Sequence, residues 1–238
     1  MKIRTKLGLD IEFLNFNQLE IHGFFLAAKA AMDTLFAGVQ TMPTKSKVVY
    51  ILRNPYDHPR YLTETPFEMI TVNAGENKPF QFMYQFAHEI GHLSSQSSSR
   101  WNKVGRHQWI EESLCGAFSI YCLRAAATSG DLVWFRNGAQ EYLTTYVEKA
   151  YPVGSQLGSD WFTANVSTLK RLNSLDDIIK PISRLIADEF SNGEFVLDNI
   201  ALGETTLNTN VDEYLDEWSK RCSLQKNVPN LLKERFAT

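Results

Sequence analysis

The stretch "FEMITVNAGENKPFQFMYQFAHEIGHL", residues 67 to 93, contains the two patterns that decide the fold. Its first part, which ends at Gly75, is rich in apolar and β-branched residues, and this composition is typical of a strand. From Pro79 onward the apolar residues recur at helical spacing, and proline is favoured in the first turn of a helix. The stretch therefore predicts a strand that is followed closely by a helix running to about Leu93.

The second half of this helix carries two histidines four residues apart, His88 and His92, with Glu89 between them. Residues at this spacing lie on one face of a helix, so both imidazoles can reach the same metal ion. Glu89 lies about 100° around the helix from His88, beside the coordination position that the protein ligands leave open. A carboxylate there can accept a proton from water that the metal activates. We therefore expect Zn²⁺ as cofactor, His88 and His92 as ligands and Glu89 as general base.

A catalytic zinc site usually has three protein ligands, and the third is expected on the next helix. That helix is predicted to run from Trp109 to about Ala127, and its first turn contains two adjacent acids, Glu111 and Glu112. Glu112 shares its helix face with small residues, whereas the face of Glu111 is bulkier. Because a ligand helix has to approach closely, Glu112 is the expected third ligand and Glu111 the alternative. If Glu112 is the ligand, Glu111 is either a first-turn acid favoured by the helix dipole or an anchor for a substrate amine.

With these residues the chain resembles the gluzincin metallopeptidases, the thermolysin-like group that combines HExxH with a glutamate on a following helix. The resemblance covers about residues 67 to 125 and includes the run "WIEE" at 109–112. It implies a zinc-dependent hydrolase of peptide bonds. It also implies a sheet whose edge strand, just before the HExxH helix, binds an extended substrate. The family often has an aspartate four residues after the third ligand to orient a histidine, but Gly116 stands there in this chain.

The segment between the two helices, residues 94 to 108, is polar and rich in serine. Because it offers little to bury, we expect a mobile flap over the cleft. His107, near the end of this segment, is a candidate catalytic residue, since the oxyanion of peptide hydrolysis usually needs a donor besides the metal. The alternative for His107 is a solvated side chain in a polar loop.

The expected fold is α+β and helix-rich. It consists of a zincin-like core with a small N-terminal sheet, the HExxH helix, the ligand helix and then a helical C-terminal half. We assign residues 1–128 to a zincin-like metal-binding region and residues 129–238 to a helical C-terminal region, which is either a subdomain or part of the same domain. The other elements predicted from periodicity are a helix at 17–38, a strand at 47–54, and helices at 131–150, 160–172, 176–190, 210–223 and 228–236.

The composition is that of an ordinary globular protein, with 44% hydrophobic and 21% charged residues and a formal net charge of −3. This charge and the scattered basic residues argue against nucleic-acid binding. Acidic residues interrupt the apolar stretches near the N-terminus, so we expect neither a signal peptide nor association with a membrane. The three cysteines form no CxxC pair, and Cys115 and Cys122 are interpreted as buried thiols. A cytoplasmic location is expected.

The leading hypothesis is a zinc metallopeptidase that acts on a peptide or protein substrate. The competing hypothesis is a zincin-fold regulatory or metal-sensing binding protein without general proteolytic activity. Glu89 favours the enzyme, because a protein that only binds metal has no need of that acid. A binding or structural module without metal is the third alternative. Whether an enzyme would be an endopeptidase or an exopeptidase, and its oligomeric state, are left open by the sequence.

Overall fold

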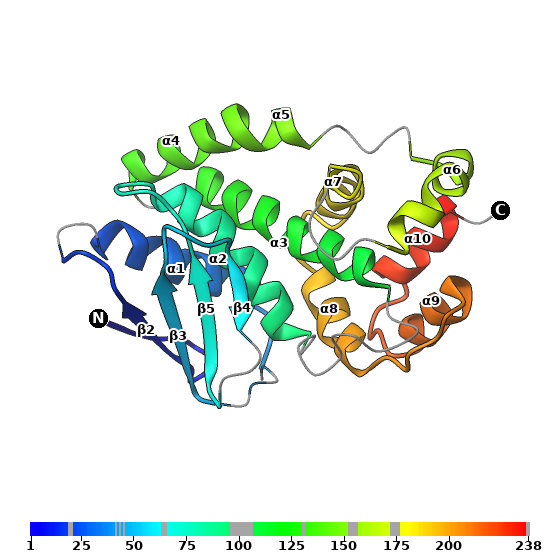
Figure 1. Cartoon of the computed structure of the whole chain (residues 1–238), viewed down its shortest axis with the longest axis horizontal. Helices are drawn as coiled ribbons and strands as arrows, with labels where there is room; N and C mark the ends of the chain where they lie inside the picture. Colours follow the sequence, from blue (N-terminus) through cyan, green and yellow to red (C-terminus); the bar gives the residue numbers. More distant parts are fainter. Residues whose placement is uncertain are drawn as a thin grey trace.

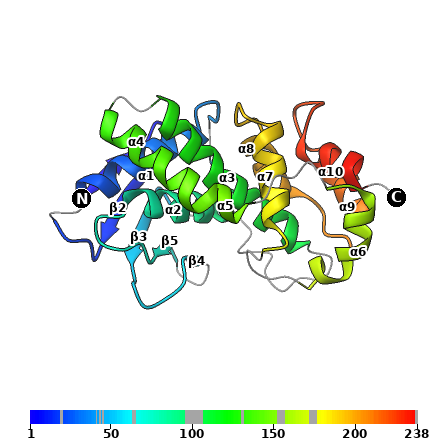
Figure 2. The ribbon, with the colours of Figure 1, turned by 90° about the horizontal axis from the view of Figure 1, so that it is seen from above.

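The fold is α+β and rich in helices, as the sequence predicts (Figure 1). A computed structural model describes residues 1–18, 21–40, 42, 44, 46–62, 66–95, 107–129, 132–151, 157–171 and 177–236. A small sheet with two helices against it forms one end of the molecule, and a group of helices forms the other (Figures 1 and 2).

Five strands form one mixed sheet in the order β1-β2-β3-β5-β4. The three central strands run parallel to one another, and each edge strand is antiparallel to its neighbour. The prediction of strands at 47–54 and 67–75 is confirmed by β3 and β5. The strands are β1 (Lys2–Arg4), β2 (Asp10–Leu14), β3 (Val48–Arg53), β4 (Arg60–Leu62) and β5 (Glu68–Val72).

The strand before the HExxH helix is not at the edge of the sheet, and this part of the expectation is wrong. The edge strand on that side is β4, which comes from the segment "HPRYLTETP" (58–66), a turn by its composition. Tyr61 lies opposite Ile70 in the antiparallel register of β4 and β5, and both side chains are buried. A three-residue strand leaves too short a pattern for its alternation to be recognised in the sequence.

Helices α1 (Ile21–Leu35) and α2 (Pro79–Ser94) cover one face of the sheet. A cluster of phenylalanine rings fills the space between these layers, with centroids 5.2 Å apart for Phe24 and Phe82 and 5.5 Å apart for Phe82 and Phe86. Pro79 occupies the first turn of α2, as its position in the sequence predicts. The face of α2 that carries Phe82 and Phe86 is buried against α1 and the sheet, so a different face of α2 meets the next helix.

The next helix, α3 (Gln108–Ser129), packs along α2 in the opposite direction, because Ser119 contacts Tyr84 while Glu111 contacts His92. Their approach is close at Gly91. A Cβ atom added there would lie 2.7 Å from the Sγ of Cys115 and 3.1 Å from its Cα. The glycine inside the HExxH motif thus lets the backbones of the two helices come near each other.

The C-terminal half is helical, and α7 and α8 lie between the sheet-bearing part and the last helices (Figure 2). Five of the regions predicted to be helical are confirmed, but residues 195–204 form a helix that periodicity does not predict. The elements are α4 (Val133–Tyr142), the π-helix η2 (Leu143–Val147), α5 (Glu148–Ala150), α6 (Ser159–Leu169), α7 (Lys180–Glu189), α8 (Phe195–Glu204), α9 (Val211–Ser219) and α10 (Val228–Phe236).

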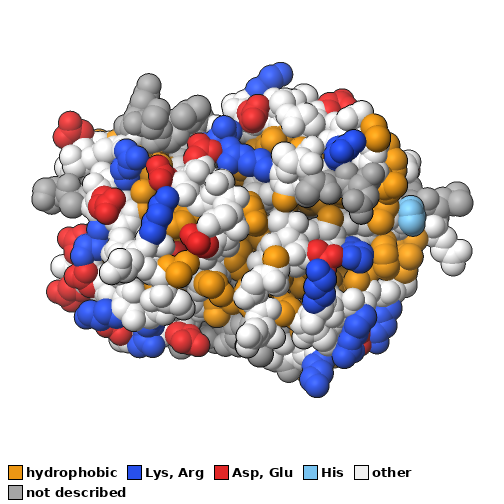
Figure 3. Space-filling view, turned by 180° about the vertical axis from the view of Figure 1, so that it is seen from behind, with side chains coloured by type: hydrophobic (Ala, Val, Ile, Leu, Met, Phe, Trp, Pro, Cys, Tyr) orange, Lys and Arg blue, Asp and Glu red, His pale blue; other side chains and the backbone are white. Residues whose placement is uncertain are grey.

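Buried apolar side chains form one connected cluster that reaches from Ile3 to Phe236. The division at residue 128 falls at the end of α3 and stays a prediction. Lys and Arg side chains are scattered among acidic ones on the face seen in Figure 3. In the part of the chain that the structure describes, no helix has both the length and the apolar character needed to cross a bilayer.

Candidate metal centre

The two histidines of α2 face the first turns of α3, where a single carboxylate lies close to both imidazoles. The His88 and His92 rings have centroids 5.0 Å apart. The Nε2 atom of His88 is 3.4 Å from one carboxylate oxygen of Glu112, and the Nε2 atom of His92 is 3.6 Å from the other. The structure thus brings together the three residues that the sequence marks as candidate ligands.

The spacing of these three groups fits a tetrahedral metal ion. Zinc–nitrogen and zinc–oxygen bonds of about 2.0–2.1 Å place neighbouring ligand atoms roughly 3.3 Å apart at the tetrahedral angle. The two separations from Glu112, 3.4 and 3.6 Å, are close to that value, and they are long for direct hydrogen bonds. An ion between the groups would therefore need only small movements of the side chains.

Glu111 also takes part in the site, but it contacts the other ring nitrogen of His92. The Nδ1 atom of His92 lies 2.7 Å from the Oε1 atom of Glu111. Because an ionised carboxylate only accepts hydrogen bonds, Nδ1 is the donor, and in the neutral ring the lone pair is then on Nε2, the atom that faces Glu112. Glu111 thus orients the imidazole of His92. From the sequence Glu111 is expected only as an alternative ligand, a first-turn acid or a substrate anchor, so this contact with His92 is not predicted.

The charges around His92 favour a cation. Burial alone lowers the pKa of an imidazole, but Cys115, Glu112 and Glu111 raise the pKa of His92 well above its ordinary value. Burial likewise tends to raise the pKa of Glu112, but His92 and His88 lower it overall. The site therefore keeps a negative carboxylate and stabilises positive charge between the helices.

Glu89 lies beside this cluster and is also buried, with 3% of its surface exposed. Burial raises the pKa of Glu89 above its usual range, although His88 and His92 lower it in part. Its carboxylate also accepts a hydrogen bond from a backbone N–H of Tyr61 in the edge strand β4. A buried carboxylate with a raised pKa is a stronger base than an exposed one, which suits it to accept and return a proton.

Cys115 also belongs to the cluster, although the sequence does not mark it as a candidate ligand. Ligand atoms of His88, His92 and Cys115 all lie within 4.8 Å of one another, and Cys115 is fully buried. Burial raises the pKa of its thiol to about 12, although the nearby His92 lowers it in part. The interpretation of Cys115 as a buried thiol is confirmed. Its position three residues after Glu112 places both side chains on the same face of the helix, so this spacing could have indicated its place in the cluster.

The expected flap lies largely outside the described residues, which stop at Ser95 and resume at His107. At its start, Ser94 and Ser95 are buried and hydrogen-bonded to α2, so these two residues do not belong to a mobile segment. His107 is buried too, and is not solvated: its Nε2 lies 2.9 Å from the carbonyl oxygen of Asn208, and its ring packs on Tyr214. The contacts that the structure gives His107 are therefore with the C-terminal half, and its catalytic role stays a prediction.

A pair of tyrosines adjoins the centre. The hydroxyls of Tyr84 and Tyr151 form a short hydrogen bond, and Tyr84 lies one helical turn before His88. Burial raises the pKa of Tyr151, and Tyr84, Tyr142 and Glu112 raise it further, which places this phenol within electrostatic reach of the cluster. The position of Tyr84 could be found from its spacing to His88, whereas Tyr151 comes from a distant part of the chain.

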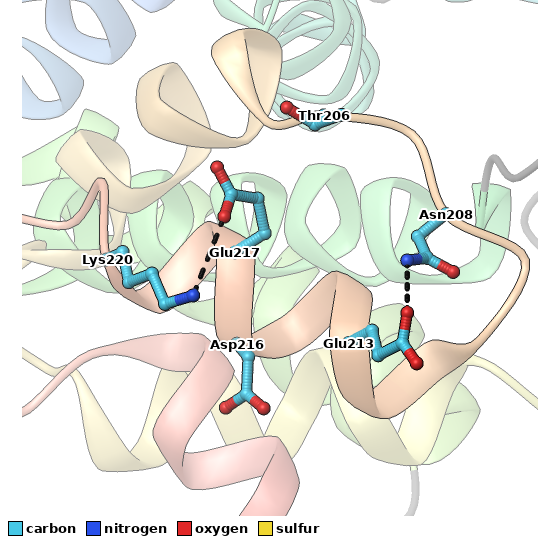
Figure 4. A pocket seen from close by; sticks show the side chains of 6 residues that line it. All are labelled: Thr206, Asn208, Glu213, Asp216, Glu217 and Lys220. Atoms are coloured by element: carbon cyan, nitrogen blue, oxygen red, sulfur yellow. Dashed lines mark hydrogen bonds and ion pairs between the residues drawn. The ribbon is translucent and has the colours of Figure 1, made fainter.

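Two cavities lie apart from the cluster. One of about 400 Å³ lies along α9, where Glu217 pairs with Lys220 and Glu213 accepts a hydrogen bond from Asn208 (Figure 4). The other, of about 470 Å³, lies between the first turn of α2 and α4, and aromatic side chains line much of it. The residues that line either cavity do not include the histidines or acids of the metal centre.

No family model, curated protein or solved structure matches this chain.

Proposed function

We propose that the protein is a zinc-dependent peptide hydrolase with a zincin-like core. The observation that supports this most directly is the position of Glu112, whose two carboxylate oxygens lie 3.4 and 3.6 Å from the Nε2 atoms of His88 and His92. Glu89 adds a second argument, because it is buried beside these residues without being needed as a ligand.

In this proposal His88, His92 and Glu112 would hold the zinc ion, and Glu111 fixes the tautomer and orientation of His92. Bound zinc would supply Lewis acidity, which activates water and polarises a peptide carbonyl. Glu89 takes the proton from the attacking water and delivers it to the leaving amine, so its raised pKa matches both steps. The burial of Glu89 beside the histidines limits competition from bulk water.

The substrate class follows from the position of the edge strand. β4 ends the sheet next to α2, and its residue Tyr61 touches Glu89 through the backbone. An extended peptide or protein segment that paired with β4 would lie beside Glu89. We place this activity in the cytoplasm, because all three cysteines carry free thiols.

The decisive experiment is the variant Glu89→Gln, measured for zinc content and for cleavage of a peptide library. We expect zinc to stay bound and hydrolysis to fall by about 100-fold or more, because general acid–base catalysis commonly contributes that much. Glu76→Gln, an exposed acid near the start of the same helix, serves as the matched control and should cleave like the wild type. Wild-type protein that binds zinc but cleaves no peptide would contradict the proposal.

The alternative of a metal-sensing or regulatory binding protein is favoured by one observation, the thiol of Cys115 within the cluster. A site with two histidines, one glutamate and one thiolate has four protein ligands and no open position for water. Such a closed site holds metal tightly but does not activate water. In that case the buried thiol would have to lose its proton on binding.

X-ray absorption of the zinc-loaded protein separates the two functions. The hydrolase requires only nitrogen and oxygen neighbours at about 2.0–2.1 Å, whereas the closed site requires one sulfur at about 2.3 Å. Cys115→Ser is the matched variant: it should keep zinc affinity and cleavage in the hydrolase, and it should weaken zinc binding in the closed site.

A further inference from the structure

Helix α8 holds the end of the HExxH helix through one buried amide. Asn199 has no exposed surface, and its Nδ2 atom donates to the carbonyl oxygen of Gly91 at 2.9 Å and to the Oγ atom of Ser94 at 2.7 Å. Gly91 lies inside the motif itself, between Glu89 and His92. The C-terminal half of the chain thus reaches the backbone of the candidate metal helix directly.

A backbone contact one turn later reinforces this junction. A Cβ atom at Gly203 would lie 2.2 Å from the carbonyl oxygen of Ser95, so the two backbones touch where α2 ends. The preceding part of α8 is fixed from the other side, because Asp198 accepts a hydrogen bond from the backbone N–H of Val228 and Trp218 donates to its carbonyl oxygen. α8 therefore connects α9 and α10 to the end of α2.

The junction continues to the imidazole of His92 through hydrogen bonds. Ser95 lies next to Ser94, and its hydroxyl contacts the carbonyl oxygen of His92 at 3.1 Å and the Oε1 atom of Glu111 at 3.4 Å. The same carboxylate oxygen of Glu111 accepts from Nδ1 of His92. A shift of the last turn of α2 would therefore disturb the group that orients His92.

Within the described part of the chain, only the donor end of the Asn199 amide has hydrogen-bond partners. Among the described residues, its Oδ1 atom is one of two buried side-chain polar atoms without a hydrogen-bond partner, the other being Nδ1 of His88. Burying a carbonyl oxygen without a hydrogen-bond partner costs free energy. An apolar residue of similar size would avoid that cost, so asparagine is favourable here only if its N–H donors are needed. The stabilising contribution of Asn199 therefore comes from its two hydrogen bonds to α2.

We propose that Asn199 is a positioning residue for the metal centre, through which the C-terminal helices set the orientation of His92 and hence the metal affinity. This inference rests on the proposed metal site. It predicts that removing the amide donor weakens zinc binding although Asn199 does not touch the ion. It also makes the helical C-terminal half a functional part of the metal centre.

The test compares Asn199→Leu with wild type and with Asp198→Asn, its neighbour on α8, in titrations of zinc against a chromophoric chelator. We expect Asn199→Leu to weaken zinc binding by about 10- to 100-fold, the range typical of residues that support a ligand. Asp198→Asn keeps an acceptor for the backbone N–H of Val228 and leaves the Asn199 bonds to α2 in place, so its zinc affinity should stay within about threefold of wild type. Equal zinc affinity of folded Asn199→Leu and wild type would overturn the proposal.

Two further measurements keep the test decisive. Ser94→Ala serves as the test if Asn199→Leu fails to fold. It removes the hydroxyl that accepts one of the two Asn199 hydrogen bonds, so it should weaken zinc binding by a smaller factor. Unchanged zinc affinity would again count against the proposal. The ring nitrogen signals of His92 in metal-free protein report its bond to Glu111 by NMR, and Asn199→Leu should shift them. If wild type binds no zinc, the proposed function fails, and the NMR result alone then decides whether Asn199 positions His92.

Discussion

Two buried carboxylates, one in each half of the molecule, have their pKa values shifted in opposite directions. Glu112, between α2 and α3, has its pKa lowered, because the imidazoles of His92 and His88 outweigh the effect of burial. Asp198, at the junction of α8 with α10, has its pKa raised to about 6, because burial dominates and its main compensating contacts are the Val228 N–H and the Cys222 thiol. Both side chains are nearly inaccessible to solvent, with exposed fractions of 3% and 2%.

The difference shows what each region is suited for. A buried carboxylate keeps its charge most readily where positive charge is available, from a protonated histidine or a metal ion. The α2–α3 interface supplies this and is arranged for a cation. At the α8–α10 junction Asp198 is compensated by hydrogen bonds from Val228 and Cys222. Asp198 therefore links the two helices, but its ionisation lowers the free energy of unfolding.

The largest effect that should separate the two acids is on zinc affinity. Glu112→Gln keeps the size of the side chain but removes the charge and most of its ability to bind metal. We expect zinc affinity to fall by at least about 100-fold, beyond the usual effect of residues that only support a ligand. Asp198→Asn, the same chemical change in the other region, should leave the affinity nearly unchanged. Near-normal zinc binding by Glu112→Gln would move the third ligand to Cys115 or Glu111.

The second effect is on the pH dependence of stability. The pKa of Asp198 is about 6 in the folded protein and about 3.9 when unfolded, so its favourable contribution is complete below about pH 3.9 and is lost as pH rises through 6. Asp198→Asn cannot ionise and can still accept from Val228. We expect it to be more stable than wild type at pH 7.5, by up to about 3 kcal/mol, and to match wild type near pH 4.

Chemical denaturation at both pH values measures this difference. Glu141→Gln removes one charge from an exposed position and should give the same small change at both pH values, which controls for net charge. A stability of Asp198→Asn below that of wild type at pH 7.5 would mean that the ionised carboxylate is needed at the junction.

The third effect concerns the close approach that brings Glu112 to the histidines. Gly91→Ala places a methyl group 3.1 Å from the Cα of Cys115, so the backbones of α2 and α3 must move apart. Overpacking of this kind costs about 1–3 kcal/mol, part of which the better helix propensity of alanine offsets. We expect a net loss of about 1–2 kcal/mol in unfolding free energy together with weaker zinc binding. Gly38→Ala, where a Cβ meets no atom within 4 Å, should change neither.

The smallest effect is expected for Glu111→Gln. The glutamine can still accept a hydrogen bond from Nδ1 of His92, but it no longer supplies the charge that raises the pKa of this ring. We expect zinc affinity to fall by about tenfold, with the same set of ligands. A loss as large as that of Glu112→Gln, measured in the same chelator titration, would exchange the roles of the two neighbouring acids.

Features that depend on one segment could be predicted well. The periodicity of residues 79–93 and the proline at its start placed His88, Glu89 and His92 on one helix, and α2 runs from Pro79 to Ser94. The small residues on its helix face favour Glu112 over Glu111, and in the structure the two carboxylate oxygens of Glu112 lie 3.4 and 3.6 Å from the two Nε2 atoms. Helical spacing is a local property, so neighbours on one face can be identified without knowledge of the rest of the fold.

Features that depend on how segments meet could not be predicted in this way. α8 was missed because its buried residues lie around the helix and include Asp198 and Asn199, so no single apolar stripe marks it. The edge position of β4 depends on which strands pair with β5, and the contact of Asn199 with Gly91 joins residues that are far apart in the chain. The contact between Glu111 and His92, like the inclusion of Cys115, depends on the distance and rotation between α2 and α3. The sequence by itself determined which residues share a helix face, whereas the tertiary packing decided which groups come within a few ångströms, because that depends on the volume of every side chain between them.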